Sequence, residues 1–308
     1  MPAPVLRAAT RGSELALWQT SHVASLMTAA SGVTVEQVVV ETAGDLRQDV
    51  HIWEIGGRGV FVKEVQTAVL QGRADFAVHS AKDLPSSPTP GLVLAAVPAR
   101  ADARDALLGA TLEGLPIGGL VATGSVRRRA QLASLRPDLT FTGLRGNIGT
   151  RLAKASGYAG IVMAAAALDR LGHSERVAEL LDSSLMVPQV GQGALAVEAR
   201  EDDLEVLGLL EAVQDGPSRL AVDAERAYLA EIGGGCDLPV GAYARLDASG
   251  RLRMDAVLAS LDGRVVLRAS GTTTVGDGAG HDLGRPLARR LLDESGGAWL
   301  LESLRGLA

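Results

Sequence analysis

Apolar and polar positions between residue 5 and about residue 97 follow two alternating periods. Short apolar or alternating runs predict strands over residues 5–10, 33–42 and 74–80. Apolar residues spaced three and four apart predict helices over residues 14–30 and 62–72. Strands that alternate with helices in this way favour a mostly parallel sheet covered on both faces.

Residues 102–188 repeat the same pattern. Strands followed by helices are predicted over residues 118–136, 139–156 and 158–172. The strand-like segment at residues 190–200 is expected to return to the first domain, which makes that domain discontinuous. We therefore expect two α/β domains of similar size.

The pattern changes from residue 217 onward. A helix over residues 218–232 is followed by three strands that only short turns separate, and consecutive strands of this kind pair antiparallel. A last helix is predicted over residues 281–295. The domains expected from these patterns are residues 1–98 with 194–212, residues 102–188, and residues 217–308, the third being a small α+β module with strands at 240–246, 251–260 and 264–274.

Composition narrows the classes of protein. The chain has 308 residues, 47% of them hydrophobic, and one cysteine, which excludes an internal disulfide and a multi-thiolate metal site. Five scattered histidines show no ligand spacing, so no metal is expected. The N-terminus lacks a signal-like pattern, no apolar run is long enough to span a bilayer, and the net charge of -6 argues against general nucleic-acid binding. We expect a cytoplasmic protein without a membrane partner.

Four polar clusters stand at the carboxyl ends of predicted strands, where the chain turns into a helix or loop. Ligands of open α/β sheets bind in the crevice outside those strand ends. Two such domains that face each other would direct all four clusters into one cleft. The first cluster is Arg11 and Ser13, and the second is Lys82 and Asp83. The third covers residues 123–128 and includes Thr123, Ser125, Arg127 and Arg128, and the fourth covers residues 145–151 and includes Arg145, Gly146 and Arg151.

The clusters contain six cations and one acid, Asp83. Guanidinium groups, hydroxyls and the N–H groups at helix starts favour a ligand with carboxylates or phosphates. Asp83 is expected to stay ionised among the cations and to pair with a transient cation or move a proton. The structural alternatives are a solvated pair for Arg127 and Arg128, a surface ion pair for Lys82 and Asp83, and helix N-caps for Ser13 and Asn147.

The single cysteine, Cys236, follows three glycines at a helix-to-strand turn. A buried, inert thiol is the ordinary alternative. A nucleophile of the hydrolase kind needs a base, and no histidine is near in the sequence, although neighbours in space are left open. A thiol used for permanent attachment of a group needs only one activation event.

Two further motifs are weaker. Residues 191–196, "GQGALA", match the dinucleotide pattern G-x-G-x-x-A, but a strand-like segment follows instead of a helix, which argues against cofactor binding there. Residues 45–60 are interpreted as a flap over the cleft that contributes Arg58.

Seven stretches of the chain, in this order, resemble the porphobilinogen deaminase family: "ATRGSELALWQ", "GGRGVFVKE", "ADFAVHSAKDLP", "TGSVRRRAQL", "LRGNIGTRL", "VGQGALAVE" and "ERAYLAEIGGGCDLPVGA". The resemblance covers the whole chain. It implies an α/β fold class, with two periplasmic-binding-protein-like α/β domains around a cleft and a small α+β C-terminal domain with a three-stranded antiparallel sheet.

The resemblance also implies a function. Cys236 would carry a dipyrromethane cofactor through a thioether, and four porphobilinogen molecules would be added to it head to tail, each losing ammonia. The expected partner is this small-molecule substrate, and the expected state is a monomer. Asp83 would bind pyrrole N–H groups, stabilise the cation left by ammonia and assist proton transfer. The residues expected to hold cofactor and substrate are Arg11, Ser13, Arg58, Lys82, Thr123, Ser125, Arg127, Arg128, Arg145, Gly146, Arg151, Arg170 and Gln192, with Asp45 as a further candidate in the flap.

Four positions depart from the family pattern, of which Tyr228 and Leu238, near Cys236, are only slightly atypical. Gly124 stands where a serine is common, and Arg58 replaces a usual lysine while keeping the charge. The competing hypothesis is a two-lobed binding protein or sensor for a polycarboxylate ligand, which would need neither Cys236 nor Asp83.

Overall fold

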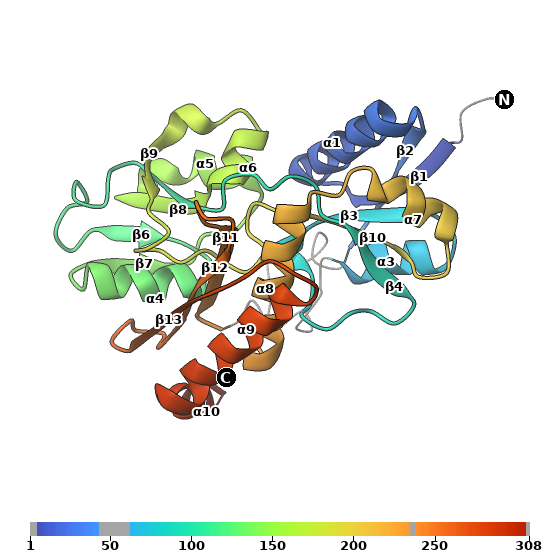
Figure 1. The fold of residues 1–308 in the computed structure, drawn as a ribbon. Coiled ribbons are helices and arrows are strands. Elements are labelled where there is room, and N and C mark those ends of the chain that lie inside the picture. Colours follow the sequence, from blue (N-terminus) through green and yellow to red (C-terminus); the bar gives the residue numbers. More distant parts are fainter. Residues whose placement is uncertain (1–4, 43–61, 235–237, 306–308) are drawn as a thin grey trace. The chain divides into compact units, whose positions relative to one another are not determined.

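The computed structural model describes residues 5–42, 62–234 and 238–305 (Figure 1). The chain divides into two compact units, Met1–Ala101 with Ala194–Arg219 and Asp102–Gly193 with Leu220–Ala308. The three domains with the boundaries given above stay a prediction. Among the described helices, none is long and apolar enough to cross a membrane.

The first unit is built on a five-stranded sheet in the order β2-β1-β3-β10-β4. β1 runs parallel to β2 and β3, whereas β10 runs antiparallel to both of its neighbours, β3 and β4. The segment after residue 190 therefore returns to this sheet, as its pattern predicted. The strands are β1 (Val5–Arg11), β2 (Thr34–Val40), β3 (Phe76–Ser80), β4 (Leu92–Ala96) and β10 (Leu195–Arg200).

Helices cover both faces of this sheet, and successive residues of a strand face opposite helices. Phe76 of β3 packs in a core with α1 (Glu14–Ser31) and α7 (Leu204–Glu211). Its neighbour Ala77 packs in a second core with α3 (Lys63–Leu70). The strands contact the apolar residues of the helices, which are spaced three and four apart. The sequence pattern predicted α1 and α3 correctly because it reads this spacing.

The second unit contains a sheet with the same arrangement, in the order β7-β6-β8-β5-β9. β6 is parallel to β7 and β8, and β5 is antiparallel to β8 and β9. The strands are β5 (Asp105–Leu108), β6 (Leu120–Ala122), β7 (Thr140–Thr142), β8 (Gly160–Ala164) and β9 (Val177–Leu181), and the helices are α4 (Val126–Leu135), α5 (Ile148–Ala153) and α6 (Ala165–Arg170).

The rest of the second unit is the expected α+β module. β11 (Val240–Leu246), β12 (Leu252–Ala259) and β13 (Val266–Thr273) form an antiparallel sheet in sequence order. It shares one core with α8 (Gly216–Ile232), α9 (Ala279–Arg289) and α10 (Gly297–Arg305), coloured from orange to red in Figure 1. Short 3₁₀ or π segments are η2 (Ala81–Asp83), η3 (Ala155–Gly157), η4 (Ser174–Arg176) and η5 (Arg290–Glu294).

The sequence pattern missed five of these elements: β4, β5, β9, α7 and α10. None of the three strands leads directly into an α-helix, so the alternation of strand and helix that marked most of the other strands of the two sheets is absent there.

Candidate active site

The first unit brings two of the predicted clusters to one edge of its sheet. β1 ends at Arg11 and β3 ends at Ser80, and the two strands are parallel neighbours. Ser13 follows β1 as the N-cap of α1, where its Oγ accepts from the N–H of Ala16 at 3.4 Å. Lys82 and Asp83 follow β3 in η2. The N-cap expected for Ser13 is therefore confirmed.

A small cavity of about 50 Å³ lies at this edge and joins the two clusters. Arg11 and Asp83 are both half-buried there. Among the residues that the structure describes, none forms a hydrogen bond or ion pair with the Asp83 carboxylate, so Asp83 and Lys82 are not the surface ion pair of the alternative interpretation. Polar residues that line the cavity are Arg11, Ser13, Gln19, His79, Ser80 and Asp83.

Gln19 fixes one wall of the cavity. It lies on the buried face of α1, and its Nε2 donates to the Ser80 Oγ at 2.9 Å. Because α1 starts at the cavity, its free N–H groups and its dipole favour a negative ligand there. The first unit can therefore bind an anion beside a carboxylate that pairs with none of the described residues.

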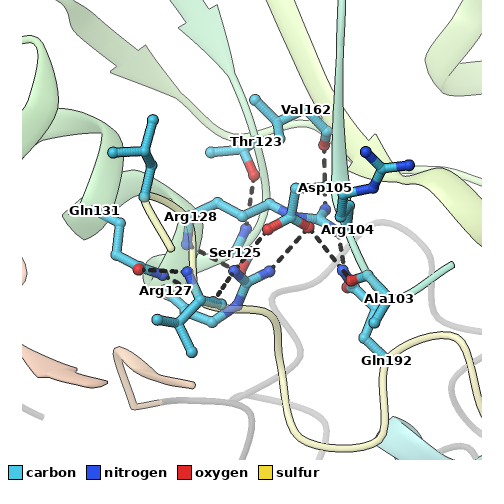
Figure 2. A network of polar contacts seen from close by, with 12 residues as sticks. Ala103, Arg104, Asp105, Thr123, Ser125, Arg127, Arg128, Gln131, Val162 and Gln192 are labelled. Atoms are coloured by element: carbon cyan, nitrogen blue, oxygen red, sulfur yellow. Dashed lines mark hydrogen bonds and ion pairs between the residues drawn. The ribbon is translucent and has the colours of Figure 1, made fainter. Parts of the chain in front are cut away.

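The second unit holds Arg127 and Arg128 in the first turn of α4 (Figure 2). Both are buried, with 2% and 6% of their surface exposed. Arg127 binds the Asp105 carboxylate with two nitrogens, at 2.7 and 3.0 Å, and Arg128 binds it through Nε at 2.8 Å. The solvated arginine pair of the alternative interpretation is therefore wrong.

Asp105 is fully buried at the start of β5 and stays ionised. Burial raises the pKa of its carboxyl group, but the charges of Arg127 and Arg128, with hydrogen bonds from Arg127 and Gln192, outweigh burial and hold the pKa well below its usual range. Two guanidinium groups around one carboxylate leave a net positive charge in this network, which suits a neighbouring anion.

Gln192 and Gln131 extend this network to loop backbones. The Nε2 of Gln192 donates to the Ala103 carbonyl at 2.7 Å and to Asp105 at 2.9 Å, and its Oε1 accepts from Arg128 at 3.1 Å. Gln131 exchanges two hydrogen bonds with the backbone of Val187. Figure 2 shows both amides at the rim of the ion-pair network.

The hydroxyl groups predicted for the site shape the turn before α4. Thr123 accepts from the N–H of Ser125 at 3.2 Å, and Ser125 is the N-cap whose Oγ accepts from the N–H of Arg128 at 3.4 Å (Figure 2). These bonds place the two arginines at the helix start.

The remaining cluster surrounds the start of α5. Gly146 has φ of +111°, and a Cβ there would lie 2.6 Å from Thr150, so only glycine fits. Its carbonyl accepts from the Nε of Arg151 at 2.8 Å. Asn147 caps the helix through Thr150, which confirms its N-cap role, and Arg145 is half-buried beside it.

Arg170, at the end of α6, donates to the carbonyl of Gly193 at 2.7 Å. Burial lowers the pKa of its guanidinium to about 10. It remains charged at neutral pH and holds the segment that leads into β10.

Cys236, Arg58 and Asp45 lie outside the described residues, as does the predicted flap. Among residues 5–42, 62–234 and 238–305, no three His, Cys, Asp or Glu side chains are grouped to hold a metal ion.

Sequence reasoning missed Asp105 and the pair His79 and Glu198. Each is a polar residue in a strand whose other residues, apart from the last one of β3 and of β10, are apolar and buried: "DALL", "FAVHS" and "LAVEAR". Burial of an ionisable group is costly unless it is paired. A charged residue inside such a strand is therefore the signal that could have found them.

Two family models match the chain. A family model described as "Porphobilinogen deaminase, dipyromethane cofactor binding domain" matches residues 6–208, and one described as "Porphobilinogen deaminase, C-terminal domain" matches residues 219–293. Proteins named porphobilinogen deaminase are similar along almost the full chain. The one from Roseiflexus sp. (strain RS-1) is 48% identical over 94% of this chain and 97% of its own length, and the one from Syntrophomonas wolfei is 44% identical over 97% and 98%.

Solved structures of bacterial binding proteins are also similar. The methionine-binding protein MetQ matches 69% of this chain and 91% of its own, with 12% identity and a TM-score of 0.43. A periplasmic substrate-binding protein of an ABC transporter from Coxiella burnetii matches 68% and 92%, with 12% identity and a TM-score of 0.43. The two family models together span most of the chain, and so the chain belongs to the porphobilinogen deaminase family.

Proposed function

We propose that the chain acts as a hydroxymethylbilane synthase, a transferase that condenses four porphobilinogen molecules head to tail with release of ammonia. The growing chain is built on a dipyrromethane bonded to the sulfur of Cys236. The observation that carries this proposal is the cavity in which the Asp83 carboxylate, with no partner among the described residues, lies with Arg11 at one sheet edge. The relatives named porphobilinogen deaminase support it, and they do not favour the binding-protein alternative.

The donor set fits pyrrole ligands. Each porphobilinogen ring carries an acetate, a propionate and a ring N–H. Arg11 and the helix start at Ser13 can bind a carboxylate, and Asp83 can accept from the N–H. In the second unit, the half-buried Arg145 and Arg151 are further cations, and the net positive charge of the buried network around Asp105 favours an anion nearby. Arginine keeps its charge next to many carboxylates, which lysine does less reliably.

The reaction balances without a redox step. A carbon–carbon bond forms between the methylene carbon of the incoming substrate and a ring carbon, the methylene–nitrogen bond breaks, ammonia leaves with the bond electrons, and the ring carbon loses a proton. Release of the tetrapyrrole would take up one water: the carbon–carbon bond to the primer would break, the primer's ring carbon would regain a proton, and the released methylene carbon would receive the hydroxyl group. The dipyrromethane, when bound, supplies the first ring carbon that is joined. Asp83 can hold the substrate N–H and stabilise the positive charge that develops as ammonia leaves, because no other described residue neutralises its carboxylate.

Intact-mass spectrometry tests the proposal. The wild-type protein is expected to be heavier than its sequence by two porphobilinogen-derived rings, and Cys236→Ser, which keeps the size of the side chain, is expected to lack that mass. The wild type is also expected to release a linear tetrapyrrole and four equivalents of ammonia from porphobilinogen. An unmodified wild-type protein with full activity would contradict the proposal.

A further inference from the structure

His79 and Glu198 form a buried polar pair that the proposed mechanism does not use. His79 is the fourth residue of β3, and Glu198 lies on β10, the antiparallel neighbour strand. His79 Nε2 lies 3.1 Å from Glu198 Oε2, and their side chains are 3% and 8% exposed. The contact has ion-pair distance, although the atoms are not aligned as a hydrogen bond.

A chain of polar contacts supports Glu198 from behind. The Gln66 Nε2, on α3, donates to Glu198 Oε2 at 2.8 Å, and the hydroxyl of Thr89 donates to Gln66 Oε1 at 3.1 Å. These groups interrupt the apolar core that Ala77 shares with α3. Burying several polar side chains in a core costs more free energy than burying apolar side chains of the same size. The arrangement therefore points to a role beyond folding.

His79 also faces the cavity that holds Asp83 and Arg11. β3 directs His79 toward α3 and the next residue, Ser80, toward α1, and both line that cavity. Because Nε2 lies at Glu198, Nδ1 is the ring nitrogen left for a ligand. The described part of the chain offers Nδ1 no hydrogen-bond partner.

The position of Glu198 determines which tautomer of His79 is favoured, and therefore what Nδ1 can do. A carboxylate 3.1 Å from Nε2 favours the tautomer with its hydrogen on Nε2, which leaves a lone pair on Nδ1. A cavity of about 50 Å³ admits the edge of one ring instead of a whole oligomer. We infer that Nδ1 of His79 accepts a hydrogen bond from a pyrrole ring N–H of the ligand, with Glu198 as the residue that positions the imidazole. This inference rests on the proposed function.

Substituting His79 by asparagine or by glutamine distinguishes a contact between Nδ1 and the ligand from a structural contact between Nε2 and Glu198. The amide of Asn reaches about as far as Nδ1 of histidine, and the amide of Gln about as far as Nε2. His79→Asn can therefore keep the ligand contact and lose the Glu198 contact, whereas His79→Gln does the reverse.

The measurement is the Kd of an unreactive porphobilinogen analogue, with a methyl group in place of the aminomethyl group, for the cofactor-loaded protein by calorimetry. Intact mass confirms the loading, and thermal unfolding confirms that each variant is folded. His79→Gln is expected to weaken binding about tenfold, and His79→Asn at most about twofold, since an unmade hydrogen bond costs on the order of 1 kcal/mol or more. Equal losses, no loss, or a larger loss in His79→Asn would overturn the inference.

Glu198→Gln tests the positioning role. As a single substitution, Glu198→Gln is expected to weaken binding of the analogue a few-fold. Added to His79→Asn, it is expected to weaken binding no further, because the imidazole that Glu198 positions is then absent. The same effect in both backgrounds would overturn that role. If the wild-type protein, loaded with cofactor, does not bind the analogue at all, the proposed function itself fails, and this inference fails with it.

Discussion

The carboxylates of Asp83 and Asp105 lie at the same edge of two similarly arranged sheets but in opposite environments. In the first unit, Asp83 is half-buried at the edge of a cavity, and none of the described residues pairs with its carboxylate. In the second, Asp105 is fully buried, with two arginines and a glutamine bound to it. An unpaired carboxylate is available to a ligand, whereas a saturated one is available only to the fold. The same edge of two similarly arranged sheets thus carries a carboxylate that we propose as reactive in one unit and a carboxylate that stabilises the fold in the other.

The largest effect is expected for activity at Asp83. Asp83→Asn keeps the size of the side chain and removes its charge, so porphobilinogen turnover is expected to fall roughly 10³-fold, as is typical when a group acting on a developing charge is removed. Unfolding in urea is expected to be unchanged, because the carboxylate has no partner to lose among the described residues. Full turnover in this variant would remove Asp83 from the reaction.

In contrast to Asp83→Asn, Asp105→Asn is expected to change mainly the stability of the protein. Removing the negative charge leaves two buried guanidinium groups without their counterion, so the free energy of unfolding is expected to fall by about 3–5 kcal/mol. Urea denaturation measures it. Asp102→Asn is the matched control, because that carboxylate forms an exposed ion pair with Arg104 and its loss is expected to change stability much less. Equal stability of the two variants would contradict the scaffold role.

Gly146→Ala is expected to have a smaller effect within the second unit. A left-handed backbone and a Cβ 2.6 Å from Thr150 oppose any side chain there, and the strain is expected to cost about 1–3 kcal/mol of unfolding free energy. Gly143→Ala is the control in the same loop, because a Cβ there meets no atom within 4 Å. If both variants unfold at the same urea concentration, the conformation of residue 146 is not required.

The smallest effect is expected in the pH dependence of stability. The folded-state pKa of Asp105 lies below its unfolded value of about 3.9, so its contribution is complete above about pH 4 and is lost as the pH falls through the folded-state pKa. This one group adds at most about 1.4 kcal/mol per pH unit to the slope. The difference between the wild type and Asp105→Asn in urea is therefore expected to shrink below pH 4. A constant difference down to pH 2 would contradict the assigned ion pairs.

Part of the site was readable in the sequence because it depends on local rules. Ser13, Ser125 and Asn147 are N-caps, and such residues in front of a periodic apolar pattern indicate a helix start. The ends of β1 and β3, near which Arg11 and Asp83 lie, were also predicted correctly. A clear apolar run marks each of these two strands, and its end is visible in the sequence.

The sequence by itself determined the alternating strands and helices, the helix starts and the presence of many cations near them, since periodicity and capping act over a few residues. Only the tertiary structure decided which cations are buried and ion-paired. Arg127 and Arg128 are buried because β5 brings Asp105 to them from 22 and 23 positions away in the chain. His79 meets Glu198 across a sheet pairing of segments more than 100 residues apart. Strand pairing between distant segments depends on the packing of the whole unit, and no local pattern encodes it.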